Sequence, residues 1–176
     1  MHLCSGFGRL IRWGMLALGL LAGAAQADDY APVTELMRAG QWPQAMARVQ
    51  QHLATKPRDP QMRFLKGLIE QDTGKSQDAI ATYNQLIQDF PELPEPYNNV
   101  AVLYAAQGQY DRARQALEMA IRVNSQYAIA HENLGDVYAR LANQAYLQSQ
   151  RLDATSTTLA PKLQLLRQLF SGAPGR

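Results

Sequence analysis

The chain has 176 residues, of which 47% are hydrophobic and 18% charged, and its formal net charge is +2. Arg9 and Arg12 supply that excess, since residues 28–176 carry 15 basic and 15 acidic residues. A neutral surface argues against nucleic-acid binding, and because Cys4 is the single cysteine, disulfides and Cys-ligated metals are excluded from residues 28–176.

Residues 1–27 have the pattern of a secretory signal peptide. Arg9 and Arg12 give a positive start, and an apolar run from Trp13 to Ala25 follows. Small residues at Ala25 and Ala27 predict cleavage after Ala27. The run is shorter than the ~20 residues that span a bilayer, so we expect a periplasmic or secreted protein with no direct membrane insertion after cleavage. An uncleaved anchor is the alternative.

The next segment repeats itself with a period of 34 residues. Gly40, Gly74 and Gly108 keep this step, as do Ala45, Ala79 and Ala113. Such a period is typical of stacked helical hairpins. It predicts units at about 30–58, 60–93 and 94–127, each with a glycine turn between two helices. The first helix, about Pro32 to Ala39, is short and is expected to be the amino-terminal cap.

The third unit carries the clearest pattern. Pro94 and Pro96 start a helix in which large, apolar, small and aromatic residues recur at three- and four-residue steps. Tyr110 to Val123 forms the second helix. This unit resembles the tetratricopeptide repeat, and the other units match it in part. The residues that carry the resemblance are Gly40, Trp42, Ala45, Gly67, Gly74, Ala79, Tyr83, Tyr97, Ala101, Tyr104, Gly108, Tyr110, Ala113, Leu117, Ala120, Leu134, Gly135 and Tyr138.

The second unit departs from the pattern in its first helix, where Arg63, Lys66 and Glu70 replace the large, apolar and aromatic residues. Neighbouring apolar side chains such as Phe64 and Ile69 could compensate through a rotated contact face.

The fourth unit, about 128–153, departs further. Tyr146, Ser149 and Leu152 lie only 29 residues after Leu117, Ala120 and Val123, so five residues are missing where the turn belongs. Arg140 to Gln150 contains no Gly or Pro. This favours one continuous helix from about Ile129 to Leu152, with a tight bend near Ala142 as the alternative. A helix over 159–170 is expected to cap the array, followed by a disordered tail at 171–176.

The resemblance implies an all-α, right-handed solenoid of antiparallel helix pairs, about 3.5 repeats in one domain over 28–170. It also implies a concave groove that binds a peptide or helix of another protein, in a periplasmic scaffold. The groove residues implied are Phe64, Leu68, Gln71, Asp72, Asn98, Val102, Ala105, Glu132, Asp136 and Arg140. The alternatives are a structural subunit of a cell-envelope assembly that uses its convex face or last helix, or a homodimer formed through the atypical last unit.

The sequence offers no pattern for catalysis. There is no His-x-x-x-His pair, no Gly-x-Ser-x-Gly elbow and no phosphate-binding glycine loop. His52 and His131 are expected to be packing or surface residues. We therefore expect no enzyme activity, no metal and no cofactor.

Overall fold

The computed structural model describes residues 27–171, and within them the chain forms α-helices and no strand. The helices are α1 (Ala27–Arg38), α2 (Trp42–Thr55), α3 (Pro60–Asp72), α4 (Ser76–Asp89), α5 (Pro94–Ala106), α6 (Tyr110–Val123), α7 (Ala128–Leu152) and α8 (Leu159–Ser171). The chain divides into two compact units between Val100 and Ala101, within α5. We call residues 27–100 the amino-terminal unit and residues 101–171 the carboxy-terminal unit.

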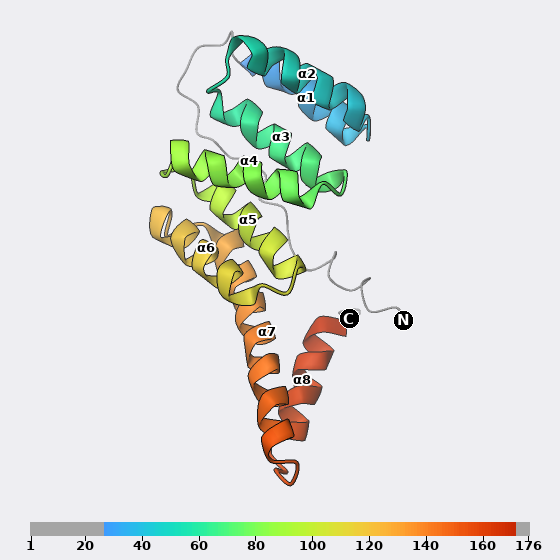
Figure 1. Ribbon diagram of the computed structural model, residues 1–176, viewed down its shortest axis with the longest axis vertical. Coiled ribbons are helices and arrows are strands. Elements are labelled where there is room, and N and C mark those ends of the chain that lie inside the picture. Colours follow the sequence, from blue (N-terminus) through green and yellow to red (C-terminus); the bar gives the residue numbers. More distant parts are fainter. Residues whose placement is uncertain (1–26, 172–176) are drawn as a thin grey trace. The chain divides into compact units, whose positions relative to one another are not determined.

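A glycine turn joins the two helices within each of the first three pairs, which are α1–α2, α3–α4 and α5–α6 (Figure 1). Gly40, Gly74 and Gly108 have φ values of 68°, 77° and 73°, a region that L-residues with a side chain rarely adopt. The amide N–H of the next residue then bonds back to a helix carbonyl, as from Gln41 to Leu36. The predicted helix–glycine–helix repeat is confirmed at all three places.

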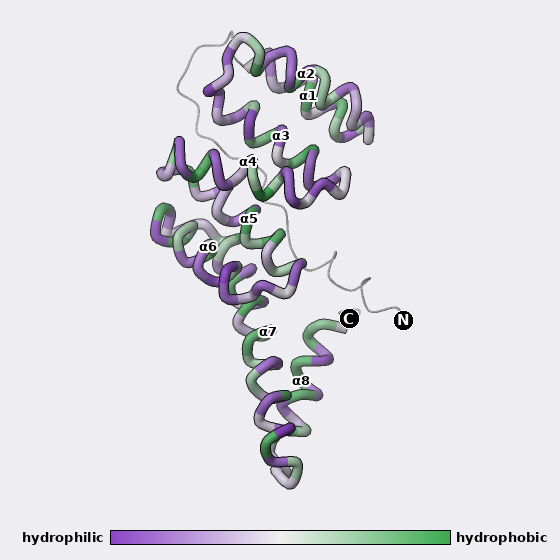
Figure 2. The backbone as a smooth tube through the Cα atoms, in the orientation of Figure 1, coloured by the Kyte–Doolittle hydropathy of each residue, from purple (hydrophilic) through white to green (hydrophobic). Residues whose placement is uncertain are grey.

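The core of the amino-terminal unit joins α1, α2 and α3. Its buried residues are Val33, Ala45, Val49, Met62, Leu65 and Ile69. Hydrophobic and hydrophilic residues alternate along α1, α2 and α3 (Figure 2), and the buried residues recur at helical spacing, as Ala45 and Val49 do in α2. Burial of these residues, rather than helix propensity alone, holds helices of 12 to 14 residues in place.

The α3–α4 pair is held by a close approach and by a buried polar network. A Cβ added at Gly67 would lie 2.5 Å from Cε1 of Tyr83, so only glycine admits this ring. Glu70 is buried; its Oε2 accepts a hydrogen bond of 2.7 Å from the Thr82 hydroxyl, and Lys66 Nζ lies 3.0 Å from its Oε1. The departures from the repeat pattern at Lys66 and Glu70 are therefore compensated by polar contacts between helices.

In the carboxy-terminal unit, α7 packs against α6 with its first half and against α8 with its second half (Figure 1). α7 is one uninterrupted helix of 25 residues. The continuous helix that the sequence favoured is confirmed, and the tight bend near Ala142 is not formed. α8 lies beside the part of α7 that extends beyond α6, with Leu159 and Leu163 buried.

The helix ends differ from the sequence predictions at two places. α1 begins at Ala27 rather than near Pro32, which lies inside the helix. A proline there removes one hydrogen bond but does not end the helix, since its ring fixes a helical φ. Ser171, predicted as the start of a disordered tail, is the last residue of α8. Residues 1–26 and 172–176 lie outside the described residues, so the signal-peptide and tail predictions stay predictions.

Candidate functional site

The predicted groove residues of the amino-terminal unit are only partly accessible. Phe64 is buried, with its ring centroid 5.7 Å from that of Tyr83, and Leu68 packs at the edge of the core. Gln71 is half-buried and its Oε1 accepts a hydrogen bond from the Tyr83 hydroxyl, 3.3 Å away. Asp72 is exposed at the end of α3. Gln71 and Asp72 thus remain as surface candidates, whereas Phe64 is a core residue.

Asn98 is also buried, with an exposed fraction of 0%. Its side-chain amide donates to Asn99 Oδ1 at 3.1 Å, and Asn99 in turn donates to the Tyr83 hydroxyl at 3.4 Å. This chain of polar contacts links α5 to α4. Asn98 therefore satisfies buried polar groups inside the unit, and its side chain is not accessible at the surface.

The carboxy-terminal unit leaves more of its predicted residues accessible. Val102, Asp136 and Arg140 are half-buried and Glu132 is exposed, whereas Ala105 is buried. Burial raises the pKa of Asp136, the negative charge of Glu132 raises it further, and Arg140 lowers it. The guanidinium carbon of Arg140 also lies 3.5 Å from the ring centroid of Phe170 in α8. Two carboxylates one helical turn apart form an acidic surface on α7.

A polar cluster that sequence reasoning missed ties α1, α2 and α3 together. Asp59 Oδ2 lies 2.8 Å from His52 Nε2 and accepts a hydrogen bond of 2.8 Å from the Tyr30 hydroxyl. Its Oδ1 caps α3 by accepting from the Met62 amide at 2.9 Å. Asp29 Oδ2 lies 3.5 Å from His52 Nδ1. No short-range motif could reveal the cluster, because its members come from three helices.

The electrostatics of this cluster follow from its hydrogen bonds. Burial alone would raise the pKa of Asp59, but donors from Met62, Tyr30 and His52 outweigh it and hold that pKa below its usual value. Burial and the hydrogen bond to Asp59 raise the pKa of Tyr30 to about 12. Of the cluster, His52 and Asp29 line a surface pocket together with Arg48 and Lys56.

Among the described residues, neither a metal site nor a membrane-spanning helix is found. Residues 27–171 contain no group of three or more His, Cys, Asp or Glu side chains placed to hold a metal ion. In the same part of the chain, every helix is too short or too polar to cross a membrane.

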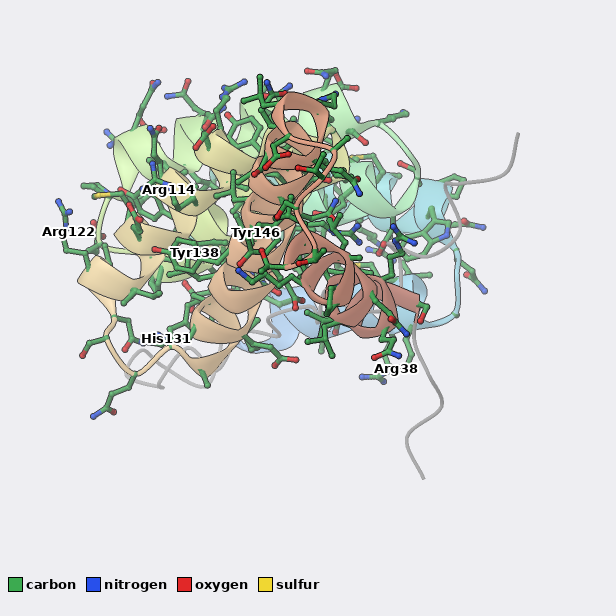
Figure 3. All side chains as sticks on the ribbon, turned by 90° about the horizontal axis from the view of Figure 1, so that it is seen from below. Arg38, Arg114, Arg122, His131, Tyr138 and Tyr146 are labelled. Carbon is green, nitrogen blue, oxygen red and sulfur yellow. The ribbon has the colours of Figure 1, made fainter. Side chains whose placement is uncertain are left out.

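The surface that the sequence did not foresee lies on α7. His131, Gly135 and Tyr138 match the large, small and aromatic positions of the repeat, but all three are exposed. A Cβ at Gly135 would meet nothing within 4 Å, and the Tyr138 hydroxyl reaches only the edge of α6, 3.3 Å from Glu118 Oε1. Figure 3 shows Tyr138 and His131 on α7, with Tyr138 next to Arg114 of α6. The missing five-residue turn was the signal for this surface.

Comparison with known families agrees with this geometry. Models described as "Tetratricopeptide repeat" match residues 30–94 and 82–115, and one described as "TPR repeat" matches residues 103–141. Together they cover residues 30–141 without a gap. The chain is a tetratricopeptide repeat protein. Proteins of this family act by binding other proteins, so its general role is that of a protein–protein interaction scaffold.

Solved structures support the same fold. TTC0263, described as a thermophilic TPR protein of Thermus thermophilus, matches with a TM-score of 0.61 and 21% identity over 82% of each chain. PilF of Pseudomonas aeruginosa matches with a TM-score of 0.62 and 19% identity, over 82% of this chain and 68% of that one. At these identities the likeness concerns the fold alone.

A curated relative is the "Probable biofilm formation methyltransferase WspC" of Pseudomonas putida, 33% identical over 92 residues. The match covers 52% of this chain but only 22% of that protein. The activity in its name belongs to a protein of which this chain spans about a fifth, so it is not carried over.

Proposed function

We propose that this tetratricopeptide repeat protein is a non-enzymatic periplasmic adaptor that binds an extended peptide or helix of a partner along the first helices of its repeats. The observation that carries the proposal is the accessible set Val102, Glu132, Asp136 and Arg140 on α5 and α7. It combines an apolar side chain with two carboxylates and one guanidinium. Apolar contacts would provide affinity, and the charges would select orientation.

The charge of this surface indicates which guests fit best. Asp136 is half-buried and its pKa is raised by burial and by Glu132, so a positive group placed beside it would relieve an unfavourable environment. A partner segment with a lysine or arginine next to apolar residues is therefore the expected ligand class. Carboxylate-rich tails are disfavoured, since they would meet two negative charges.

Photocrosslinking in intact cells tests the adaptor proposal. A benzoylphenylalanine replacing Val102 should crosslink a partner, whereas the same group at Gln115, exposed on α6, should not. Asp136→Lys should reduce the Val102 crosslink by reversing the charge, while Asp136→Asn should reduce it less. Equal crosslinking from Val102 and Gln115, or an Asp136→Lys variant that captures the partner as well as the wild type, would refute groove binding.

The periplasmic location rests on the sequence pattern of residues 1–27. Export predicts a mature chain that begins at Asp28, which mass spectrometry of the protein purified from the periplasmic fraction would detect. A chain that retains residues 1–27 in the cytoplasmic fraction would overturn this part of the proposal and leave groove binding intact.

A structural role through α8 is the second candidate. Leu165 and Leu169 on this helix are 65% and 50% exposed and lie one helical turn apart, so together they offer a small apolar patch to a partner. A crosslinker at Leu165 that captures an envelope component, with none captured at Val102, would favour this role over the groove.

A further inference from the structure

One side of α7 presents a stripe without aspartate, glutamate, lysine or arginine along the length of the helix. It consists of residues at alternating steps of four and three: His131, Gly135, Tyr138, Ala142, Ala145, Ser149 and Leu152. All are exposed except Ala142, which is half-buried, and Tyr138 and Leu152 are 49% and 79% exposed. These steps keep the seven residues on one side over about 32 Å of helix.

The neighbouring helices leave most of this stripe open, and α6 reaches it where the Tyr138 hydroxyl donates to Glu118 Oε1 at 3.3 Å. The buried residues of α7, Ala130, Asn133 and Val137, lie on a different side, and α6 packs against this half of the helix. α8 contacts α7 through Arg140 and Tyr146, since the Phe170 ring lies on Arg140 and Lys162 Nζ lies 5.2 Å from the Tyr146 ring centroid. The stripe is therefore a third side of α7.

Earlier repeats show what normally covers these positions. Gly67 receives the ring of Tyr83 from its paired second helix. One period later, Tyr97, Ala101 and Tyr104 are 8%, 0% and 6% exposed. One further period leads to His131, Gly135 and Tyr138, which are exposed because the fourth unit has no second helix folded back on its first.

The chain does contain residues with the pattern of that second helix. Tyr146, Ser149 and Leu152 match Leu117, Ala120 and Val123, and Leu117 and Ala120 are 1% and 0% exposed. Because five residues of turn are missing, these residues continue along α7 and cannot fold back onto its first half. A second copy of the chain can supply them to that half.

We propose that α7 pairs antiparallel with α7 of a second copy, so that each carboxy-terminal half covers the His131–Tyr138 surface of the other. The repeat gives the register, because Gly135 corresponds to Gly67 and Tyr146 corresponds to Tyr83. The contact between Gly67 and Tyr83 therefore predicts that Gly135 lies opposite Tyr146 of the second copy. The four–three spacing allows registers that differ by seven residues, and one of them places Gly135 opposite Ala145. The two registers agree within one residue and put the two-fold axis next to Arg140.

Size and charge both fit this register. The pairs that face each other are Tyr138 with Ala142, Gly135 with Ala145, and His131 with Ser149, so each larger side chain meets a small one. Leu141 meets Leu141 of the second copy beside the axis. On α7 and its C-cap, the charged residues beside the seam are Glu132, whose copies lie about 24 Å apart along the axis, and Asp153. On α6, Glu118 lies next to Tyr138 and its charge is paired with Arg114. No like charges are forced together.

Cysteine crosslinking tests the register directly. In a purified chain carrying Cys4→Ser, His131→Cys and Ser149→Cys are introduced singly. Each residue lies about 27 Å from its own copy in the proposed dimer, far beyond the ~7 Å between Cα atoms that a disulfide tolerates. We expect covalent dimers when the two single variants are mixed and oxidised, and essentially none from either alone. Crosslinking of His131→Cys with itself would indicate a parallel arrangement and overturn the proposal.

Sedimentation tests the association without cysteines. Tyr138→Glu should raise the dissociation constant of the dimer at least about tenfold, since it places a charge against Ala142 of the second copy. Gln144→Glu, exposed on another side of α7, is the matched control and should leave that constant unchanged. Circular dichroism of both variants confirms that they fold. Self-pairing would be refuted if the wild-type chain remains monomeric at all concentrations, or if the α7 stripe is covered only by a different protein. The inference is independent of groove binding.

Discussion

Alanine at two glycines on matching repeat positions should change stability in opposite directions. Gly67 and Gly135 are two periods apart, and both lie inside helices. At Gly67 a Cβ would lie 2.5 Å from Cε1 and 2.8 Å from Cζ of Tyr83, whose exposed fraction is 0%. At Gly135 nothing lies within 4 Å. The same substitution therefore meets a packed ring in one place and open space in the other.

The expected magnitudes follow from packing and helix propensity. Inserting a methyl group into a packed core costs about 1–3 kcal/mol, and replacing a helical glycine by alanine returns about 1 kcal/mol. Because the fully buried ring of Tyr83 has little room to move, we expect Gly67→Ala to lower the free energy of unfolding by about 1–2 kcal/mol. Gly135→Ala should raise it by up to about 1 kcal/mol in the monomer.

Urea unfolding followed by circular dichroism at 222 nm measures both effects. With a slope of about 2 kcal/mol per molar urea, the midpoint should fall by roughly 0.5–1 M for Gly67→Ala and rise by up to about 0.5 M for Gly135→Ala. Gly67→Ala in a Tyr83→Leu background should be less harmful, because the clash is with the ring. If the two alanine variants shift the midpoint in the same direction, the argument from the exposed fourth unit is wrong.

Substitutions at three further positions probe other contacts by the same unfolding assay. Asp59→Asn should lower the free energy of unfolding by about 1–2 kcal/mol at pH 7. The pKa of Asp59 is lowered in the folded state, so its ionised form stabilises the fold at pH values above its ordinary pKa of about 4. The difference in unfolding free energy between wild type and Asp59→Asn should therefore shrink as pH falls through the folded pKa. A difference that stays constant down to pH 3 would contradict this. Glu70→Ala should cost about 1–3 kcal/mol, because it removes the acceptor of the buried Thr82 hydroxyl and the carboxylate that pairs with Lys66, whereas a neutral result would show that water replaces it. Gly108→Ala should cost about 1–2 kcal/mol because φ is 73°, and Gly108→Asn should cost less; equal stability of all three would contradict the turn argument.

The repeat could be predicted from sequence because its strongest signals are local. A glycine with positive φ between two apolar-periodic runs leaves little choice of structure, as at Gly74. The long α7 was predictable for a similar reason, since Arg140 to Gln150 contains no residue that breaks a helix. Each inference needed only neighbouring residues and the 34-residue step.

The groove residues were harder to predict because their exposure depends on the rest of the array. Phe64, Asn98 and Glu132 occupy the same repeat position, yet the first two are buried and the third is exposed. Family analogy placed all three on the surface. The role of Glu70 was missed for a different reason: its partner Thr82 lies on another helix, and the repeat pattern contains an aromatic residue there.

Restoring the missing turn should convert the long helix into an ordinary repeat. Counting from both sides, Arg140 matches Ala106 and Leu141 matches Arg112, so the absent residues correspond to Gln107 through Asp111. Inserting Gln-Gly-Gln-Tyr-Asp between Arg140 and Leu141 should let the second half of α7 fold back onto Gly135 within one chain.

Spin labels at the positions of His131 and Ser149 report this change, measured in an excess of unlabelled chain so that only distances within a chain contribute. In the wild type they lie about 27 Å apart along one helix. A hairpin should bring them within about 15 Å, since paired helix axes lie 8–10 Å apart. Insertion of five alanines is the control, which should lengthen the helix and increase the distance to about 34 Å.

The turn insertion should also abolish dimerisation, because the surface that the second copy covers would then be covered by the chain's own second helix. If the turn insertion gave the same distance as the alanine insertion, the residues from Tyr146 to Leu152 would not be a displaced second helix, and the exposed face of α7 would need another explanation.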